Sequence, residues 1–398
     1  MQIEPTVTFH QAPEGHIDAK LLVDETDVSS LAIIPLRMRI GAAIVPVDGI
    51  GGVETPEAHR MRGYARRLLE ATVEHMRRGE AALSFLYGIQ DFYPKFGYAT
   101  VGFDHRLRLT RLDRPIPFPP GWSMRRGQPE DLPWILELYA RMIPSLVGAV
   151  ERPHESRVWD KLAQTLRGDA HDECRVAIDP SGAVRGYAWH AKGCWPVDMG
   201  ERWSPEMYFL GEVIGDSPPA ADMLLAGCRE WANEAAQGRS EALRHLGLGA
   251  APGTTVATSA QHWTAEAVHY SWDGAGPMVR LLDITRLLRA LQPELTSRIQ
   301  TMYPRPAGTL RIETDEGAAT LRVNPEHVVV VDDDIPVDDG SALTIHLPHT
   351  AMARLALGGF PPEDLLARLP EPPTAQAMDL MCALFPRRYP YMYPPDRP

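Results

Sequence analysis

Four arginines surround a single glycine in the segment HRMRGYARRLLEA, residues 59–71. The apolar residues that follow recur at helical spacing, so the arginines lie at the start of a predicted helix. A helix N-terminus carries a partial positive charge, which disfavours basic residues there. The placement becomes favourable when an anion binds to the free N–H groups of the first turn. Arg60 and Arg62 would then add charge-assisted hydrogen bonds to phosphate oxygens, and Gly63 would let the backbone approach closely.

The segment around the arginine cluster matches neither of two common phosphate-binding motifs. The glycines of GIGGVE, residues 49–54, are not followed by Lys-Ser or Lys-Thr, so the segment is not a Walker phosphate loop. The same glycines precede the helix instead of opening it, which excludes a dinucleotide fingerprint. A solvated basic surface is the simplest alternative to an anion site, and it remains open for Arg66 and Arg67.

Metal-ligating residue types gather at three further places. In HDEC, residues 171–174, neighbouring side chains on an extended chain point to opposite faces, so a polar loop is favoured over a metal site. His346 and His349 are separated by a proline and are expected at a strand end and in a turn. The aspartates of VDDDIPVDDG, residues 331–340, lack the order of a calcium loop and predict a solvated turn. The sequence therefore predicts no metal.

The elements that would position the arginine cluster follow the order strand, turn, helix and strand. Residues 29–47 are rich in Ile and Val and predict strands with turns. The glycines of residues 49–63 predict a turn. The helix is expected from Tyr64 to Arg78, with Gly79 as its C-cap. The apolar run AALSFLYGI, which follows, predicts a short buried strand.

Composition limits the class of protein. The chain has 398 residues, of which 44% are hydrophobic, and a prior of about 100–200 residues per domain gives two to four domains. The net charge of -12 argues against a nucleic-acid partner and suits cationic small molecules or basic peptides. Four widely spaced cysteines favour a reducing compartment, the cytoplasm. The first residues lack a signal-peptide pattern, and no apolar run is long enough for a membrane span.

Three blocks separate along the chain, at residues 1–118, 119–283 and 284–398. A proline-rich connection, DRPIPFPPGW, ends the first block. The second block predicts a helix, a hairpin around DPSG and another helix, an element order like that of the first block but without its arginine cluster. The third block predicts three strands, then a strand and two helices. Its tail, LFPRRYPYMYPPDRP, is proline-rich and expected to be extended.

The quoted residues resemble a known family. Residues 51–71, GGVETPEAHRMRGYARRLLEA, resemble the coenzyme A pyrophosphate loop of GCN5-related N-acetyltransferases (GNAT), with its Arg/Gln-x-x-Gly-x-Gly/Ala pattern at Arg60 to Ala65. Residues 83–103, LSFLYGIQDFYPKFGYATVGF, look like the next strand and helix of that family. The three blocks and the tail are similar to the Eis-type acetyltransferases. The resemblance implies a mixed α/β fold: an active GNAT domain, a degenerate GNAT-like domain and a sterol-carrier-protein-like domain.

The resemblance also assigns roles to single residues. Tyr93 matches the tyrosine that acts as general acid, although packing with its aromatic neighbours remains an alternative. The family's general base is the carboxylate of the C-terminal residue, here Pro398 where relatives commonly end in Phe, and Asp396 is a second candidate. The residues expected to bind acetyl-CoA are Val53, Glu54 and Thr55 along the pantetheine arm, Met61, Arg62, Gly63, Tyr64, Ala65 and Arg66 around the pyrophosphate, and Gly88 and Ile89 beside the thioester.

The implied function is acetyl-CoA-dependent N-acetyl transfer. The acceptor would be a primary amine on a cationic aminoglycoside, polyamine or lysine-like group, acetylated directly in a ternary complex. The resemblance also implies a homo-oligomer, a trimer or hexamer. Only about twenty residues precede LLVDETDVSS, too few for the helices that usually open the first domain, so we expect either that this domain is abbreviated or that another segment covers that face. The alternative function is a binding protein that holds an apolar ligand in the sterol-carrier-like domain on a degenerate acetyltransferase scaffold.

Overall fold

The structure is a computed structural model of the chain. It describes residues 4–102, 104–168, 172–191, 207–237, 244–263, 265–270, 274–331 and 342–398. Residue 171 of the HDEC segment and residues 332–340 of the aspartate-rich segment lie outside this description. The chain divides into two compact units, each described here by itself. The first comprises residues 1–103, 272–390 and 398, and the second comprises residues 104–271 and 391–397.

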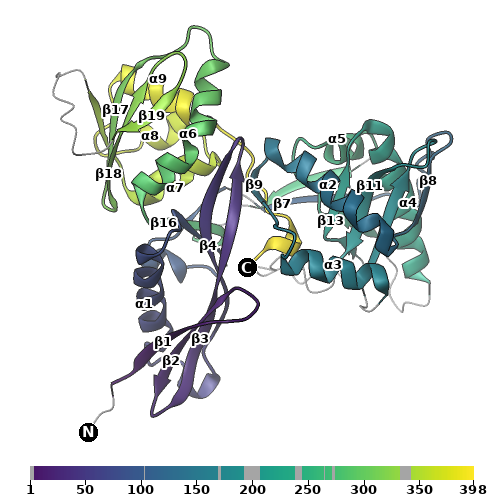
Figure 1. Cartoon of the computed structure of the whole chain (residues 1–398), viewed down its shortest axis with the longest axis horizontal. Helices are drawn as coiled ribbons and strands as arrows, with labels where there is room; N and C mark the ends of the chain where they lie inside the picture. The colour runs from purple at the N-terminus through teal and green to yellow at the C-terminus, as the bar shows by residue number, and fades with distance from the viewer. Residues whose placement is uncertain are drawn as a thin grey trace. The chain divides into compact units, whose positions relative to one another are not determined.

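A twisted sheet forms the centre of the first unit (Figure 1). Its strand order is β1-β2-β3-β4-β5-β16-β6. Neighbouring strands are antiparallel except β4 and β5, which are parallel and are connected through α1. The bounds are β1 Thr6–Gln11, β2 Ile17–Val23, β3 Thr26–Ile40, β4 Ala43–Glu54, α1 Tyr64–Arg78, β5 Leu83–Gly88, β6 Ala99–Thr100 and β16 Gly276–Leu281.

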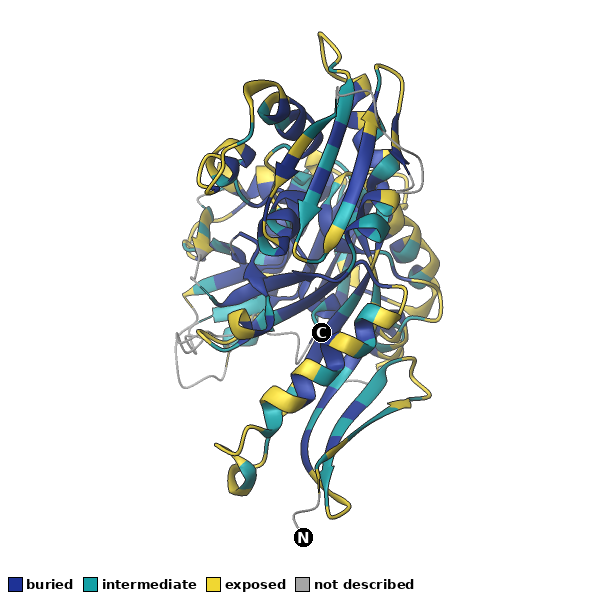
Figure 2. Ribbon diagram, turned by 90° about the vertical axis from the view of Figure 1, so that its left-hand side faces the viewer, coloured by how far each residue is buried: buried dark blue, intermediate teal, exposed yellow. Residues whose placement is uncertain are grey.

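Helix α1 follows its sequence pattern closely. Leu68, Leu69, Val73 and Met76 lie buried on one face, as a helical repeat requires, and pack in one apolar cluster with Leu31 and other residues of β3. The helix ends at Gly79, which confirms the predicted C-cap. Figure 2 shows the general pattern, with buried residues on strands and inner helix faces and exposed residues on turns.

The glycine-rich segment after β3 differs from its prediction. Strand β4 continues through Gly49 and Gly51 to Glu54, so the predicted turn begins only at Thr55 and contains a short 3-10 helix, η1 (Glu57–His59). The prediction of a turn from residue 49 was therefore wrong. Strand β3 is 15 residues long and pairs with β4 as far as Glu54, which keeps the glycines extended. The described residues before β3 form the two strands β1 and β2.

The later part of the first unit forms a second sheet with helices. The strand order is β19-β18-β17-β20. The predicted strands and helices of this region are present, but His349 is the first residue of a helix and is buried, so the prediction of a turn there was wrong. A sterol-carrier-like identity of this region stays a prediction. The bounds are α6 Ile284–Gln300, β17 Gly308–Thr314, β18 Gly317–Val323, β19 Val328–Val331, β20 Leu343–His346, α7 His349–Leu357, α8 Pro362–Leu366 and α9 Ala375–Leu384.

Among its described residues, the second unit contains two four-stranded sheets, ordered β13-β11-β10-β8 and β12-β14-β7-β15. Antiparallel β10 and β11 confirm the hairpin predicted around DPSG. The strand bounds are β7 Asp104–Leu109, β8 Ser123–Arg126, β9 Val147–Val150, β10 Glu173–Ile178, β11 Val184–His190, β12 Met207–Leu210, β13 Glu212–Gly215, β14 His245–Leu248 and β15 Ala265–Tyr270. The helix bounds are α2 Leu132–Met142, α3 Arg157–Arg167, α4 Pro218–Ala236 and α5 Thr255–His262.

Two strands pair across the domain boundaries predicted at residues 118 and 283. Strand β7 precedes residue 118 but pairs with β14 and β15 in the second unit. Strand β16 precedes residue 283 but pairs with β5 and β6 in the first unit. The compact units therefore follow strand pairing, and the three-domain division stays a prediction. The mixed α/β class is confirmed. Among the described residues, none of the helices is both long enough and apolar enough to cross a membrane.

Candidate active site

The parallel strands β4 and β5 separate partway along their length. Registered pairs join Val47, Asp48 and Gly49 to Leu83, Ser84 and Phe85. Beyond these pairs β4 continues to Glu54 and β5 to Gly88. The register of β4 against β3 also shifts in this stretch, between the pairs that Ser30 and Ala32 make. A β-bulge of this kind bends a strand and is frequent beside active sites.

The end of the chain lies against β4 where the strands separate. A Cβ placed on Gly51 would come within 2.7 Å of the carboxyl carbon of Pro398, and one on Gly49 within 2.8 Å of the Pro398 Cβ. Real Cβ atoms do not approach other atoms so closely, so only glycine fits at these two positions without movement. The glycines thus make room for the terminal carboxylate on the face of β4 that carries them.

Tyr93 lies at the end of β5. It opens a short 3-10 helix, η2 (Tyr93–Phe96), and is buried. A Cβ on Gly88 would come within 2.9 Å of the Tyr93 ring. The ring also meets Phe92 and Tyr98 edge-on, with centroids 5.0 and 6.2 Å away. Burial raises the pKa of the Tyr93 phenol above its usual value, so the phenol keeps its proton at neutral pH.

Tyr93 and Pro398 lie on opposite faces of the sheet. Ile33 and Ile50 are paired across β3 and β4, and both pack in the cluster beneath α1 that includes Tyr93. Gly51, the next residue of β4, points to the other face, toward Ile34 and Pro398. A group held between the separated strands would therefore meet the phenol from one side and the terminal carboxylate from the other.

Asp48, a residue of β4, carries a carboxyl group that can be compared with that of Pro398. Burial raises the pKa of Asp48 to about 6, against the opposing influence of Arg286. Successive residues of a strand point to opposite faces, so the Asp48 side chain points away from the face on which Gly49 and Pro398 lie. Asp48 is therefore a poor substitute for the terminal carboxylate.

The N-terminus of α1 has the features of an anion site. Within this fully described helix, no side chain caps the N-terminus and no acidic residue lies in the first turn. Gly63 is the N-cap at φ +79°, and a Cβ there would have no neighbour within 4 Å. Arg62 and Arg66 are exposed beside it. Free amides, open space and two unburied cations fit a diphosphate.

The other arginines of the cluster have partners within the protein. Arg60 donates from Nε to the carbonyl oxygen of Thr55, 3.0 Å away, and so closes the loop before α1. Arg67 lies 3.3 Å from a carboxylate oxygen of Glu4 in an exposed ion pair. Arg67 therefore fits the alternative of a solvated basic surface. Arg66 is exposed and remains a predicted residue of the anion site.

The remaining residues predicted to contact acetyl-CoA lie at the ends of β4 and β5, in the loop after β4 and in the first turn of α1. The Ser29 hydroxyl donates to the carbonyl oxygen of Glu54 at 3.0 Å and lies 2.9 Å from the Thr55 hydroxyl. These contacts fix the end of β4 and occupy part of the hydrogen-bonding capacity predicted for the pantetheine arm. Met61 and Ile89 are exposed apolar side chains. The other predicted contacts, Val53, Tyr64 and Ala65, are half-buried on β4 and in the first turn of α1.

Asp396, the alternative base, is bound within the second unit. Its two carboxylate oxygens accept from Nε and Nη2 of Arg152, at 2.7 and 2.8 Å, and the Tyr139 hydroxyl donates to it at 3.3 Å. Arg152 also pairs with Glu212. Both Arg152 and Asp396 have side chains about 1% exposed. A carboxylate held in this way by a buried guanidinium is a structural anchor and has no access to an acceptor amine.

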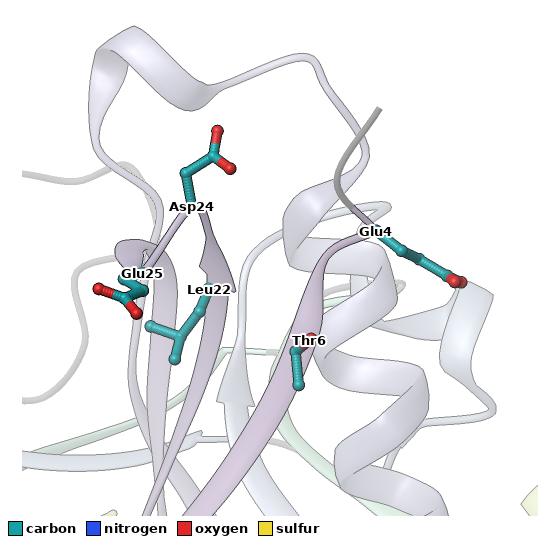
Figure 3. Close-up of a pocket in the computed structure, with 5 residues that line it drawn as sticks. All are labelled: Glu4, Thr6, Leu22, Asp24 and Glu25. Carbon is teal, nitrogen blue, oxygen red and sulfur yellow. The ribbon is translucent and has the colours of Figure 1, made fainter. Parts of the chain in front are cut away.

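A cleft of about 480 Å³ lies elsewhere on the first unit and is lined by Glu4, Thr6, Leu22, Asp24 and Glu25 (Figure 3). The close-up shows Asp24 and Glu25 at the turn between β2 and β3, and Glu4 and Thr6 at the start of β1. None of the residues predicted to bind acetyl-CoA lines it. Among the described residues, no group of His, Cys, Asp and Glu has the arrangement of a metal site.

Sequence reasoning missed Gly49, Gly51 and Arg152. The signal for the glycines was present, because a glycine inside a strand often marks a close approach of another backbone. Arg152 had no local signal, since it is separated from Asp396 by 244 positions.

Part of the chain matches a known family of domains. Residues 16–101, which include β2 to β6 and Tyr93, match the family model described as an acetyltransferase (GNAT) domain. The match confirms a GNAT domain in the first block, and the degenerate GNAT-like domain of residues 119–283 stays a prediction. No curated protein matches the sequence.

Solved structures are similar over nearly the whole chain. A GCN5-related N-acetyltransferase from Kribbella flavida is 21% identical with a TM-score of 0.67, covering 94% of this chain and 87% of that one. One from Anabaena variabilis is 17% identical with a TM-score of 0.71, covering 94% and 89%. Eis1 from Mycobacterium abscessus is 16% identical with a TM-score of 0.59, covering 95% and 89%. At these identities the likeness shows a shared fold.

Proposed function

We propose that this protein is an acetyl-CoA-dependent N-acetyltransferase that acts on a primary amine of a cationic acceptor. The observation that carries the proposal is the position of the Pro398 carboxyl carbon against Gly51, at the point where β4 and β5 separate. The same opening has Tyr93 at its other face. Pro398 as proton acceptor and Tyr93 as proton donor would then flank one opening between β4 and β5, two strands that lie within the residues that match a GNAT domain.

The chain's own residues would hold acetyl-CoA by its two ends. The N-terminal amides of α1, with Arg62 and Arg66, would bind the diphosphate, and Gly63 would leave room for it. The end of β4 at Val53 and Glu54, with Thr55 after it, would bind the pantetheine arm. Gly88 and Ile89 would lie beside the thioester. Bound acetyl-CoA supplies the acetyl group in an activated form.

Pro398 would serve as the general base. A primary amine has a pKa near ~10.4, and a C-terminal carboxyl group has a pKa near ~3.5, so at neutral pH the amine is charged and the carboxyl group is ionised. The carboxylate would attract the ammonium group and take its proton, directly or through water, which leaves a nucleophilic amine. Asp396 is poorly suited to this role because of its buried pairing with Arg152.

Tyr93 would serve as the general acid. Its raised pKa keeps the phenol protonated, so it can give a proton to the departing sulfur. No covalent bond to the protein is needed in such a direct transfer. Cys174 and Cys228 are buried, which raises their thiol pKa values and leaves them poorly suited to act as nucleophiles.

The acceptor class rests on charge. The net charge of -12 favours a cationic acceptor such as an aminoglycoside, a polyamine or a lysine side chain. We further propose that residues 119–283 are a degenerate GNAT-like copy and residues 284–398 a sterol-carrier-like domain, in a cytoplasmic homo-oligomer, a trimer or hexamer. No arginine cluster precedes α4 in the second segment as one precedes α1, which supports its degenerate status.

A direct assay tests the proposed function. Purified protein is mixed with acetyl-CoA and a panel of aminoglycosides, polyamines and lysine peptides, and free thiol and acetylated amine are measured. We expect amine-dependent thiol release that is faster with cationic acceptors than with neutral amines of the same size. Failure to bind acetyl-CoA in calorimetry, together with no thiol release across the panel, would refute the proposal.

A further inference from the structure

The short helix that carries Tyr93 is held at its other end by side chains from distant parts of the first unit. The carbonyl oxygen of Phe96 accepts a hydrogen bond from Nη1 of Arg280, on β16. The carbonyl oxygen of Gly97 lies 3.0 Å from Nε2 of His349, the first residue of α7. Both carbonyls belong to the C-terminal end of η2, where backbone acceptors lack partners within the helix.

Two adjacent acidic residues hold the Arg280 and His349 side chains in place. Asp315 accepts from the backbone N–H of His349 at 2.6 Å and lies 2.7 Å from its Nδ1. Glu316 accepts from Arg280 and also pairs with Arg77. Asp315 and Glu316 form the turn between β17 and β18. We refer to Arg280, His349, Asp315 and Glu316 as the η2 clamp.

The His349 ring lies between two acceptors. One ring nitrogen faces a carboxylate and the other faces a carbonyl, and both of these groups only accept. The ring therefore bridges the Asp315 carboxylate and the Gly97 carbonyl.

Gly97 is adapted to this contact. Its φ of +76° lies in the left-handed region, and a Cβ there would come within 1.7 Å of Arg280 Nη1 and 2.6 Å of His349 Nε2. Two backbone hydrogen bonds join the end of η2 to its start. The N–H of Gly97 donates to the carbonyl oxygen of Pro94, and the N–H of Tyr98 donates to the carbonyl oxygen of Tyr93. A movement of Gly97 therefore also moves Tyr93, which lies one helical turn earlier.

We propose that His349, held by Asp315, is a positioning residue that fixes the η2 turn and thereby the Tyr93 hydroxyl. The inference rests on the proposed function, in which Tyr93 is the proton donor. A single 3-10 turn has too few internal hydrogen bonds to be rigid by itself. A proton donor must be held within a fraction of an ångström of its working position. The clamp supplies that rigidity from the C-terminal part of the first unit.

A double-mutant cycle tests the proposal. The variants are His349→Leu, which removes both ring nitrogens, Tyr93→Phe, and the two combined. We expect His349→Leu to lower kcat by about 10- to 100-fold with little change in the KM for acetyl-CoA. In the Tyr93→Phe background the same change should have almost no further effect, because the group it positions is already absent. Equal losses in both backgrounds would overturn the proposal.

Two further variants distinguish positioning from general destabilisation. His349→Gln retains an N–H donor toward Gly97 and should recover a large part of the lost kcat. His346→Leu removes a neighbouring exposed histidine, at the end of β20, and should leave kcat unchanged. No recovery in His349→Gln, or an equal loss in His346→Leu, would contradict a positioning role.

An activity-independent measurement separates this inference from the proposed function. Hydrogen–deuterium exchange of the peptide spanning residues 92–98 should rise in His349→Leu and stay unchanged in His346→Leu. Unchanged exchange in His349→Leu would refute the clamp whatever the enzyme does. If exchange rises but Tyr93→Phe leaves kcat unchanged, the clamp has no acid to position, and both this proposal and the role of Tyr93 fail while acetyl transfer itself can stand.

Discussion

The carboxyl carbon of Pro398 lies against Gly51, where a Cβ on the glycine would come within 2.7 Å of it. The last residue of the chain therefore lies against β4, at the point where β4 separates from β5. Gly49 and Gly51 lie on the same face of β4. The carboxylate against this face is that of Pro398, the last residue, and not that of a β4 side chain.

Gly51→Ala should displace the terminal carboxylate. The added methyl group would occupy the space of the Pro398 carboxyl carbon, while the extended backbone of β4 accepts alanine readily. We expect kcat to fall by about 10- to 100-fold. The dissociation constant for acetyl-CoA should change little, because the N-terminus of α1 is untouched. Steady-state kinetics and calorimetry measure the two quantities, and an unchanged kcat would show that the carboxylate is not needed at that place.

Gly63→Asp should abolish acetyl-CoA binding, because it places an anion where the diphosphate is expected. Gly63→Asn is the matched control: it has nearly the same shape, and both side chains tolerate the positive φ of this position. The space around a Cβ here is open, so neither variant creates a clash. Calorimetry should show a much larger loss for Asp than for Asn. Equal affinities would mean that the phosphates bind elsewhere.

Tyr93→Phe should lower kcat and change its pH dependence. Activity that requires a protonated phenol is complete below the phenol's pKa and is lost as the pH rises through it. Burial raises that pKa above its usual 10, so the alkaline decline of kcat should have its midpoint above pH 10. In Tyr93→Phe the remaining activity, expected to be lower by about 100-fold, should lack this decline. A decline of the same shape in both proteins would assign it to another group.

Asp396→Asn should loosen the end of the chain. The variant keeps the side-chain shape but leaves Arg152 paired with the carboxylate of Glu212 alone, among the described residues. We expect the free energy of unfolding to fall by about 2 kcal/mol, the typical scale for hydrogen bonds to charged groups. Thermal and denaturant unfolding measure this loss. Since Pro398 is two residues away, kcat should fall as well.

Asp131→Asn provides the control for that variant. Asp131 also forms a two-point pair with an arginine, Arg125, in the second unit, but it is far from the tail in sequence. It should lower stability without lowering kcat. If Asp396→Asn behaves in the same way, the anchor has no part in placing Pro398.

Local pattern predicted the elements well where one face of an element is buried. The run from Tyr64 to Gly79 showed both its apolar face and its C-cap, and the structure contains both. The segment from Gly49 to Glu54 was misread, because glycine usually marks a turn and its other use, to admit a neighbouring backbone, depends on a contact far away in the sequence.

The candidate site was predictable in part for the same reason. The arginine–glycine loop and Tyr93 lie in one continuous segment and could be recognised together. The contacts of Pro398 with β4, of Arg152 with Asp396 and of His349 with Gly97 join residues more than two hundred positions apart. Such contacts follow from strand pairing and packing, which a single sequence does not display.

The most direct test of the central claim changes only the terminal carboxylate. Protein ligation can produce the full-length chain with Pro398 as a C-terminal amide, which removes the negative charge and the basic oxygen while keeping every side chain. With a cationic amine acceptor that the unmodified chain acetylates, kcat should fall by about 100-fold or more, while acetyl-CoA still binds with unchanged affinity. Full activity in the amide would contradict the assignment of Pro398 as the base.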